Sequence, residues 1–185
     1  PDAYIELIFN PRTGDIIRGR GNGNLQLSVS SSGDFDLFGK YTVEEGAYNF
    51  TTSIINKEFQ LVPGGSINWF GNPYEGQMDI TATYRQLADI QDWNPEDSAS
   101  QRRPVQVVLD MNGPMLAPEI SFELELSDQS NVDLTSSWNR SIATINSDEE
   151  ELKRQVFSLL MLRKFSQQED FIVGGQNTLS EGLTS

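Results

Sequence analysis

Apolar and polar side chains alternate along most of this chain, and this alternation constrains the fold more than any other feature of the sequence. The clearest run lies at residues 119–126, where four apolar side chains alternate with serine and glutamate. Similar runs recur from Leu25 onwards, separated by short turns rich in glycine, asparagine and proline. Because the side chains of a strand point alternately to its two faces, a period of two predicts strands with one apolar face.

Short connections favour antiparallel pairing of strands that follow one another in the sequence. No helical pattern lies between the runs, which argues against a parallel sheet built from βαβ units. We therefore predict an all-β fold with at least eight strands. The alternation by itself fits a single curved sheet or a two-sheet sandwich, since both bury one face of each strand.

One helix is expected after the last strand, over residues 147–165. Ser147 and Glu150 have the spacing of a capping box, and acidic residues fill the first turn. Arg163 and Lys164 lie near the other end, where positive charge stabilises a helix. The second half of this helix is apolar over a wide arc, so part of it is expected to contact something other than its own sheet.

The helix divides the chain into three predicted parts. A sheet domain covers residues 1–146, the amphipathic helix follows, and a flexible tail rich in Gly, Ser and Thr covers 166–185. Within the first part, the polar segment 89–104 is predicted to be a long loop. The chain opens without a methionine or a signal peptide, so we expect it to be a piece of a longer protein.

Acidic residues outnumber basic ones by 27 to 13, which gives a formal net charge of −14. Such a surface repels phosphate backbones, so nucleic acid is not expected as a partner. The absence of cysteine and histidine excludes disulfides, Ser-His-Asp triads and histidine-ligated zinc. The carboxylate pairs at Glu44–Glu45 and Glu123–Glu125 fit a solvated strand face better than a catalytic pair. We predict no enzyme activity, no catalytic residues, no cofactor and no metal site.

The tryptophans keep an alternative function open. Trp93 and Trp138 lie in polar segments and have the chemistry to stack on sugar rings. Trp69 alternates with apolar neighbours, which is typical of a core position. The alternative hypothesis is a carbohydrate-binding β-sandwich module of an envelope protein.

A series of motifs in a fixed order resembles the C-terminal domain of the TamB family, the inner-membrane component of the translocation and assembly module. The motifs are GKYTVEEGAYNF at 39–50, FQL at 59–61, GSINWFGNP at 65–73 and MDITATY at 78–84. Further matches follow at 105–109, at 118–122 and in the SLL of the predicted helix at 158–160. The resemblance spans roughly residues 35–165, and no anchor helix or long repetitive β body is present to compare.

This resemblance implies a strongly curved, mainly antiparallel sheet that forms an open apolar groove, called a β-taco in the family. Eight residues are then expected to line the groove: Leu27, Val43, Phe50, Leu61, Trp69, Ile80, Leu109 and Phe122. The predicted helix would cap the groove with Leu152, Val156, Leu159 and Leu160. It would offer a partner face made of Phe157, Met161 and Phe165.

The resemblance also implies a function in outer-membrane biogenesis. The expected cargo is phospholipid or a nascent outer-membrane protein, and the expected partner is a β-barrel assembly protein of the TamA/BamA kind. The domain would then be the periplasmic part of a cell-envelope protein that is anchored in the inner membrane.

Overall fold

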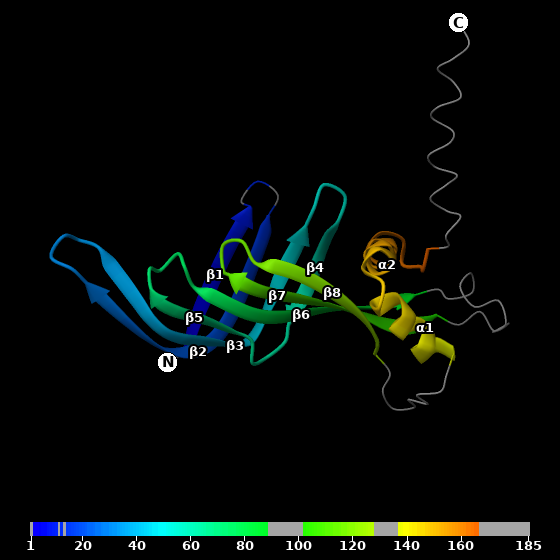
Figure 1. Ribbon diagram of the computed structural model, residues 1–185, viewed down its shortest axis with the longest axis horizontal. Helices are drawn as coiled ribbons and strands as arrows, with labels where there is room; N and C mark the ends of the chain where they lie inside the picture. The colour runs from blue at the N-terminus through cyan, green and yellow to red at the C-terminus, as the bar shows by residue number, and fades with distance from the viewer. Residues whose placement is uncertain (1, 11, 13, 89–101, 128–136, 167–185) are drawn as a thin grey trace, which may run out of the picture. The chain divides into compact units, whose positions relative to one another are not determined.

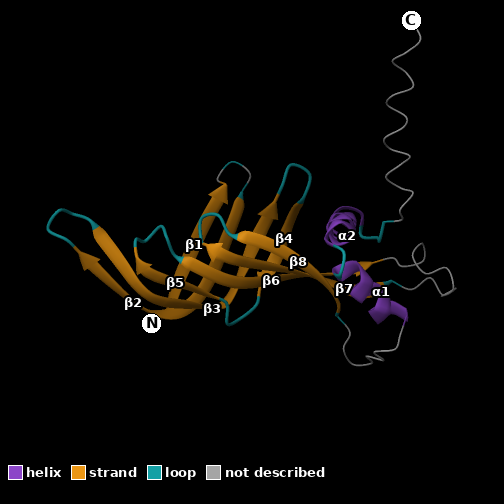
Figure 2. Ribbon diagram, in the orientation of Figure 1, coloured by secondary structure: helices purple, strands orange, loops and turns teal. Residues whose placement is uncertain are grey.

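The computed structural model describes residues 2–10, 12, 14–88, 102–127 and 137–166. Eight strands and two helices lie in these residues (Figures 1 and 2). The strands are β1 (Asp2–Asn10), β2 (Asp15–Val29), β3 (Phe35–Thr51), β4 (Asn56–Leu61), β5 (Ser66–Gly71), β6 (Gln77–Ala88), β7 (Arg103–Pro114) and β8 (Glu119–Leu126). The helices are α1 (Ser137–Asn146) and α2 (Glu149–Leu162).

The chain divides into two compact units. Unit 1 contains Pro1–Arg85 and Gln106–Glu125, and unit 2 contains Gln86–Val105 and Leu126–Ser185. Unit 1 therefore holds most of the sheet, whereas unit 2 holds both helices and the ends of three strands.

The strands form one antiparallel sheet in the order β1-β2-β3-β4-β6-β7-β8, and β5 pairs with β3 and β6. This confirms the predicted all-β fold with at least eight strands. Because the described strands belong to a single sheet, the sandwich architecture of the alternative hypothesis is wrong. β4 and β5 both pair with β3, and they follow each other along it as the two halves of an interrupted strand.

Two irregularities lie next to each other in the sheet and bend it, one at Glu44 of β3 and the other at the turn between β4 and β5. Arg20 pairs with Glu45 but Gly21 pairs with Val43, so Glu44 is an extra residue in β3. At the same level, the turn between β4 and β5 is tied to β3: Val43 N donates to Gly65 O, and Gly64 N donates to Val43 O, at 2.8 and 2.9 Å. An extra residue bends its strand and increases the local twist, which contributes to the curvature of the sheet.

Two glycines allow β2 and β3 to approach each other at positions where no other residue fits. A Cβ atom on Gly21 would lie 2.0 Å from Thr42 O, and one on Gly39 would lie 2.0 Å from Asn24 O. Gly39 also has a φ of +124°, a backbone conformation that residues with a side chain rarely adopt. Gly21 of β2 and Gly39 of β3 are thus required for close packing of the two strands.

The predicted capping box at the start of the long helix is wrong. Asp148, with φ −122°, is the N-cap of α2, and its carboxylate accepts from Glu150 N and Glu151 N. The Ser147 hydroxyl instead donates to Thr144 O at 2.7 Å. The reason is α1, which ends directly before Ser147 and uses its hydroxyl to satisfy a carbonyl at its own C-terminus.

The end of the helix also differs from the prediction. α2 ends at Leu162, and Arg163 adopts a left-handed conformation with φ 58°. The chain then turns back, and Gln155 fixes it through two hydrogen bonds of 2.8 Å to the backbone of Ser166. Phe165 is consequently 1 % exposed. Its predicted place on a free partner face is wrong, because it packs back into unit 2.

α1 was not expected from the sequence and lies inside the range predicted for the sheet domain. Ile142 and Ile145 form its buried face, three residues apart. β7 begins at Arg103, so the predicted loop 89–104 ends in strand, and residues 89–101 lie outside the described residues, as does the tail from 167. Neither described helix has the length and apolar character needed to cross a membrane.

Candidate functional site: the apolar interior face

One face of the sheet in unit 1 is apolar across successive strands. The pairing register places the side chains of Tyr41 and Ile67 on the same face, and likewise those of Tyr48 and Phe59. Six of the eight predicted groove residues are at most 8 % exposed: Val43, Phe50, Leu61, Trp69, Ile80 and Leu109. Phe122 is half-buried. Leu27 differs from the others, since it is 61 % exposed.

Aromatic contacts show that this face is concave. The ring centroids of Phe50 on β3 and Phe122 on β8 lie 5.9 Å apart at an interplanar angle of 78°. In the sheet order, β4, β6 and β7 separate these two strands. Rings carried by strands so far apart in the sheet can touch only if the sheet curls around them. At this level the interior is filled by side chains.

Further edge-to-face pairs extend the contact on both sides. Phe50 also contacts Tyr48 and Phe59, with centroids 6.0 and 5.9 Å apart, and Tyr48 contacts Phe9 on β1 at 6.0 Å. Pairs of this kind contribute about 0.5–1.5 kcal/mol beyond the burial of their area. The aromatic cluster therefore stabilises the curved state of the sheet.

Tyr41 is a component of the interior that sequence reasoning missed. Gly19, Gly21 and Gly23 alternate along β2 and leave the interior face of that strand without side chains. The Tyr41 hydroxyl lies there and donates to Ala3 O at 2.9 Å and Gly19 O at 3.3 Å. Glycines spaced by two opposite a tyrosine are the sequence signal that would have indicated this contact.

Beyond the filled part, the same apolar face continues along the ribbon of β2 and β3, where β1 no longer pairs with β2 after Asn22. Leu25, Leu27 and Val29 of β2 pair with Gly39, Leu37 and Phe35 of β3. β5 ends at Gly71, opposite Leu37, so the ribbon extends past it, as Figure 1 shows. Four side chains of this ribbon, which we call the apolar rim, are 42–66 % exposed: Leu25, Leu27, Val29 and Phe35.

Two titratable side chains lie next to aromatic rings of the sheet, Asp15 beside Tyr48 and Lys57 beside Tyr84. Burial raises the pKa of the Asp15 carboxyl, and a hydrogen bond from Tyr48 partly opposes this shift. Burial also raises the pKa of Tyr48, as do its hydrogen bond to Asp15 and the charge of Asp15. The Lys57 ammonium lies 5.6 Å from the centroid of the Tyr84 ring. The described residues contain no cluster of acidic side chains suited to a metal ion.

In unit 2, α2 has a buried and an exposed side. Leu152, Val156, Leu159 and Leu160 are at most 8 % exposed, and that they cap the groove stays a prediction. Gln86 Nε2 donates to Leu159 O at 2.7 Å and ties the helix to the end of β6. On the predicted partner face, Phe157 is half-buried and Met161 is 48 % exposed. Trp93 lies outside the described residues, as does the side chain of Trp138.

A single curved antiparallel sheet with one apolar face defines an all-β class of domain. A family model, the TamB C-terminal domain, matches residues 2–185, so the chain belongs to the TamB C-terminal domain family. No curated protein and no solved structure matches it. The family is a non-enzymatic one of the cell envelope that acts with a partner in outer-membrane biogenesis.

Proposed function

We propose that this domain is a non-enzymatic conduit that shelters apolar cargo on its interior face during transit between the two membranes. The cargo is the acyl chains of phospholipids or the strands of an outer-membrane protein. The observation that carries the proposal is the apolar rim, where the interior face continues as four apolar side chains that are 42–66 % exposed. In an ordinary core such side chains are buried.

The rim has the chemistry to hold an apolar chain by burial alone. Transfer of a fully exposed Leu, Val or Phe side chain from water contributes about 1.5–3 kcal/mol. The four rim side chains are about half exposed, so a bound chain that covers them gains a fraction of this for each. Such binding is reversible and independent of sequence, as a conduit requires.

Both kinds of cargo fit this face, but they make different demands on it. An acyl chain needs apolar contact alone, whereas a polypeptide strand must also satisfy its backbone N–H and C=O groups. β1 and β8 are the two edges of the sheet, and an edge strand is where a further strand can pair. In the full-length protein, we propose an inner-membrane anchor and a TamA/BamA-like barrel as the partner that receives the cargo.

The test is lipid capture by the domain purified without detergent. Leu27→Asp combined with Val29→Asp places two charges on the rim, and Ser28→Asp places one on the opposite face of the same strand as the control. We expect phospholipid detected by native mass spectrometry to fall at least about fivefold in the double variant alone, with an unchanged thermal midpoint. Equal lipid content in the wild type and the double variant would contradict the proposal for lipid cargo.

Positions 27 and 28 also serve to test polypeptide cargo. A photo-reactive side chain at position 27 should crosslink to unfolded outer-membrane protein, and one at position 28 should not. Equal yields at the two positions, together with unaltered lipid content, would show that the rim is not a cargo surface.

A further inference from the structure

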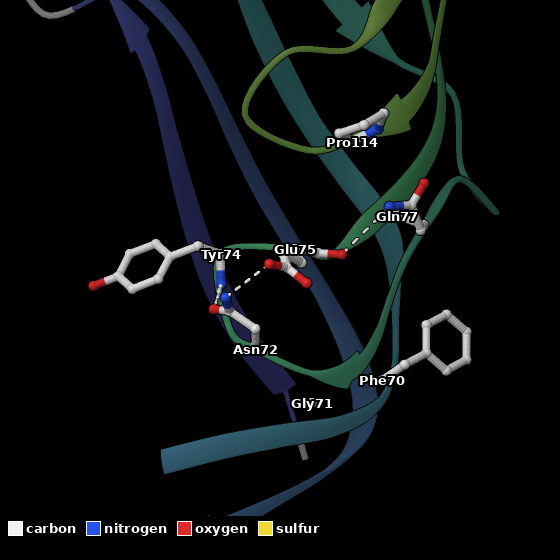
Figure 3. Close-up of a pocket in the computed structure, with 7 residues that line it drawn as sticks. All are labelled: Phe70, Gly71, Asn72, Tyr74, Glu75, Gln77 and Pro114. Carbon is white, nitrogen blue, oxygen red and sulfur yellow. Dashed lines mark hydrogen bonds between the residues drawn. The ribbon is translucent and has the colours of Figure 1, made fainter. Parts of the chain in front are cut away.

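A pocket of about 440 Å³ lies at the five-residue connection between β5 and β6 (Figure 3). Phe70 and Gln77 line it and are exposed, whereas their neighbours Trp69 and Met78 point into the core. Pro114, at the end of β7, closes it from another strand. The pocket is therefore separate from the proposed conduit, and the inference below does not depend on that proposal.

Two aromatic rings flank this pocket and remain in solvent. Phe70 is 76 % exposed, the highest value among the large apolar side chains that the structure describes, and Tyr74 is 67 % exposed. In Figure 3 their rings point to opposite sides of the pocket. Rings at such exposure add little to the stability of the fold, and their faces are available to stack on a ligand.

Hydrogen bonds hold the polar side chains of the pocket in place before any ligand binds. Asn72 Nδ2 donates to Glu75 Oε1 at 3.0 Å, and Asn72 Oδ1 accepts from Tyr74 N at 3.0 Å. Gln77 Nε2 donates to Glu75 O at 3.4 Å. Each amide keeps one N–H free of these bonds, and Glu75 Oε2 accepts none from the described residues. The pocket thus presents both donors and acceptors from a fixed loop.

We propose that this pocket binds one sugar ring of a neutral oligosaccharide. A sugar hydroxyl both donates and accepts, so it matches a carboxylate next to amides, and the C–H face of the ring packs on an aromatic side chain. The volume lies within the range of small-molecule sites. The residues differ from Trp93 and Trp138, which the sequence singled out for sugars.

Charged ligands fit the pocket less well than a neutral sugar. A polyanion is repelled by Glu75 and by the net charge of −14. A lysine or arginine side chain of a basic peptide would use the carboxylate, but it would face the amide N–H groups of Asn72 and Gln77, which repel a cation. The mixed donor and acceptor set therefore favours hydroxyl groups.

The test is titration of the 185-residue chain with cellohexaose and with chitohexaose, followed by amide NMR shifts. We expect binding with a Kd on the order of 1 mM for at least one of the two. The shifts should be confined to the amides of residues 70–72 and 74–77 and of the neighbours of Pro114, because Pro73 and Pro114 have no amide proton. Tyr74→Ala should weaken this binding about tenfold. Tyr4→Ala is the matched control, because Tyr4 is 62 % exposed on β1, outside the pocket, and its loss should change nothing.

The salt dependence of binding, and a titration with the cationic peptide hexa-arginine, distinguish a pocket that binds a sugar from one that binds a cation. Glu75→Gln keeps the hydrogen-bonding capacity of the side chain and removes its charge, so sugar binding should change by less than about threefold and should not depend on salt. The absence of shifts with either oligosaccharide at about 10 mM, which is 10-fold the expected Kd, would overturn the proposal. Sugar binding by Tyr74→Ala that is as tight as binding by the wild type would also overturn it. So would salt-sensitive binding of hexa-arginine at residues 70–77 without any sugar binding. Unchanged thermal midpoints of the variants confirm that each result concerns binding.

Discussion

Single residues on β2 and β3 decide how tightly the sheet can curl. Gly19 and Gly21 lie two apart on the same face of β2, yet their surroundings differ. A Cβ on Gly19 would meet Leu61 Cδ1 at 3.5 Å, which is ordinary contact, whereas a Cβ on Gly21 would overlap Thr42 O. The two positions therefore form a matched pair for testing close strand approach.

Gly21→Ala is expected to destabilise the domain by about 3 kcal/mol or more, because the backbone of β3 must move to accept the methyl group. Gly19→Ala should change the free energy of unfolding by less than about 1 kcal/mol. The measurement is thermal unfolding followed by circular dichroism, where the first change should lower the midpoint by roughly 10 °C. Similar midpoints for the two variants would mean that the strands have room to separate at Gly21.

A second prediction at this scale concerns Asp15. Its Oδ1 atom is buried without a hydrogen bond, and its folded-state pKa is raised above the ordinary 3.8. The folded state thus holds this proton more tightly than the unfolded chain does. Stability from this group is present at low pH and is lost as pH rises from about 4 through the folded-state pKa. Asp15→Asn removes that loss and keeps a polar partner for Tyr48.

We expect the thermal midpoint of Asp15→Asn to exceed that of the wild type at pH 7 and to approach it at pH 3.5. Glu123→Gln, at an exposed position of β8, serves as the control and should give the same small difference at both pH values. An equal difference at pH 3.5 and 7 for Asp15→Asn would show that its carboxyl is not the titrating group.

At the scale of elements, the sequence predicted strand faces better than element ends. The inward positions of β3 change from odd numbers at Tyr41 and Val43 to even numbers at Tyr48 and Phe50. This change is visible in the sequence and reports the extra residue at Glu44. In contrast, α2 ends in a left-handed residue that is an arginine, where glycine is the usual signal. No local sequence pattern indicates that the helix ends at Leu162. The prediction therefore placed Phe165 on the exposed face of the helix, which is wrong.

The exposed side of α2 carries the third prediction. Phe157→Glu with Met161→Glu should lower the thermal midpoint much less than a charge on the buried side of α2 does, because Met161 is 48 % exposed and Phe157 is half-buried. If this side is a partner surface, co-purification with a TamA/BamA-like barrel protein should fall several-fold. Leu160→Glu is the control for folding, since Leu160 is 1 % exposed and a charge there should unfold unit 2. A large drop in midpoint for the double variant, with undiminished binding per folded molecule, would assign both residues to the core.

At the scale of the whole sheet in unit 1, the alternation in the sequence identified the interior face but not its extent. Leu27 and Ile80 belong to similar alternating runs, and both were predicted to line the groove. The structure gives them exposures of 61 % and 0 %. The difference arises from the number of strands that curl over each position, and that number depends on which strands pair. Long-range pairing, such as β5 with β3, leaves no local signal in the sequence.

This difference leads to the last prediction, which separates a filled core from an open rim on one continuous face. Ile80→Ala should lower the free energy of unfolding by about 2–5 kcal/mol, because neighbouring side chains cannot fully collapse into the cavity that it leaves. Leu27→Ala removes a side chain that has few neighbours to lose, so we expect a change within about 0.5 kcal/mol. Urea unfolding of both variants measures the two values. A cost above about 2 kcal/mol for Leu27→Ala would mean that the rim is covered in solution by another part of the chain. The rim would then be core, and the conduit would have no open surface on which to take up its cargo.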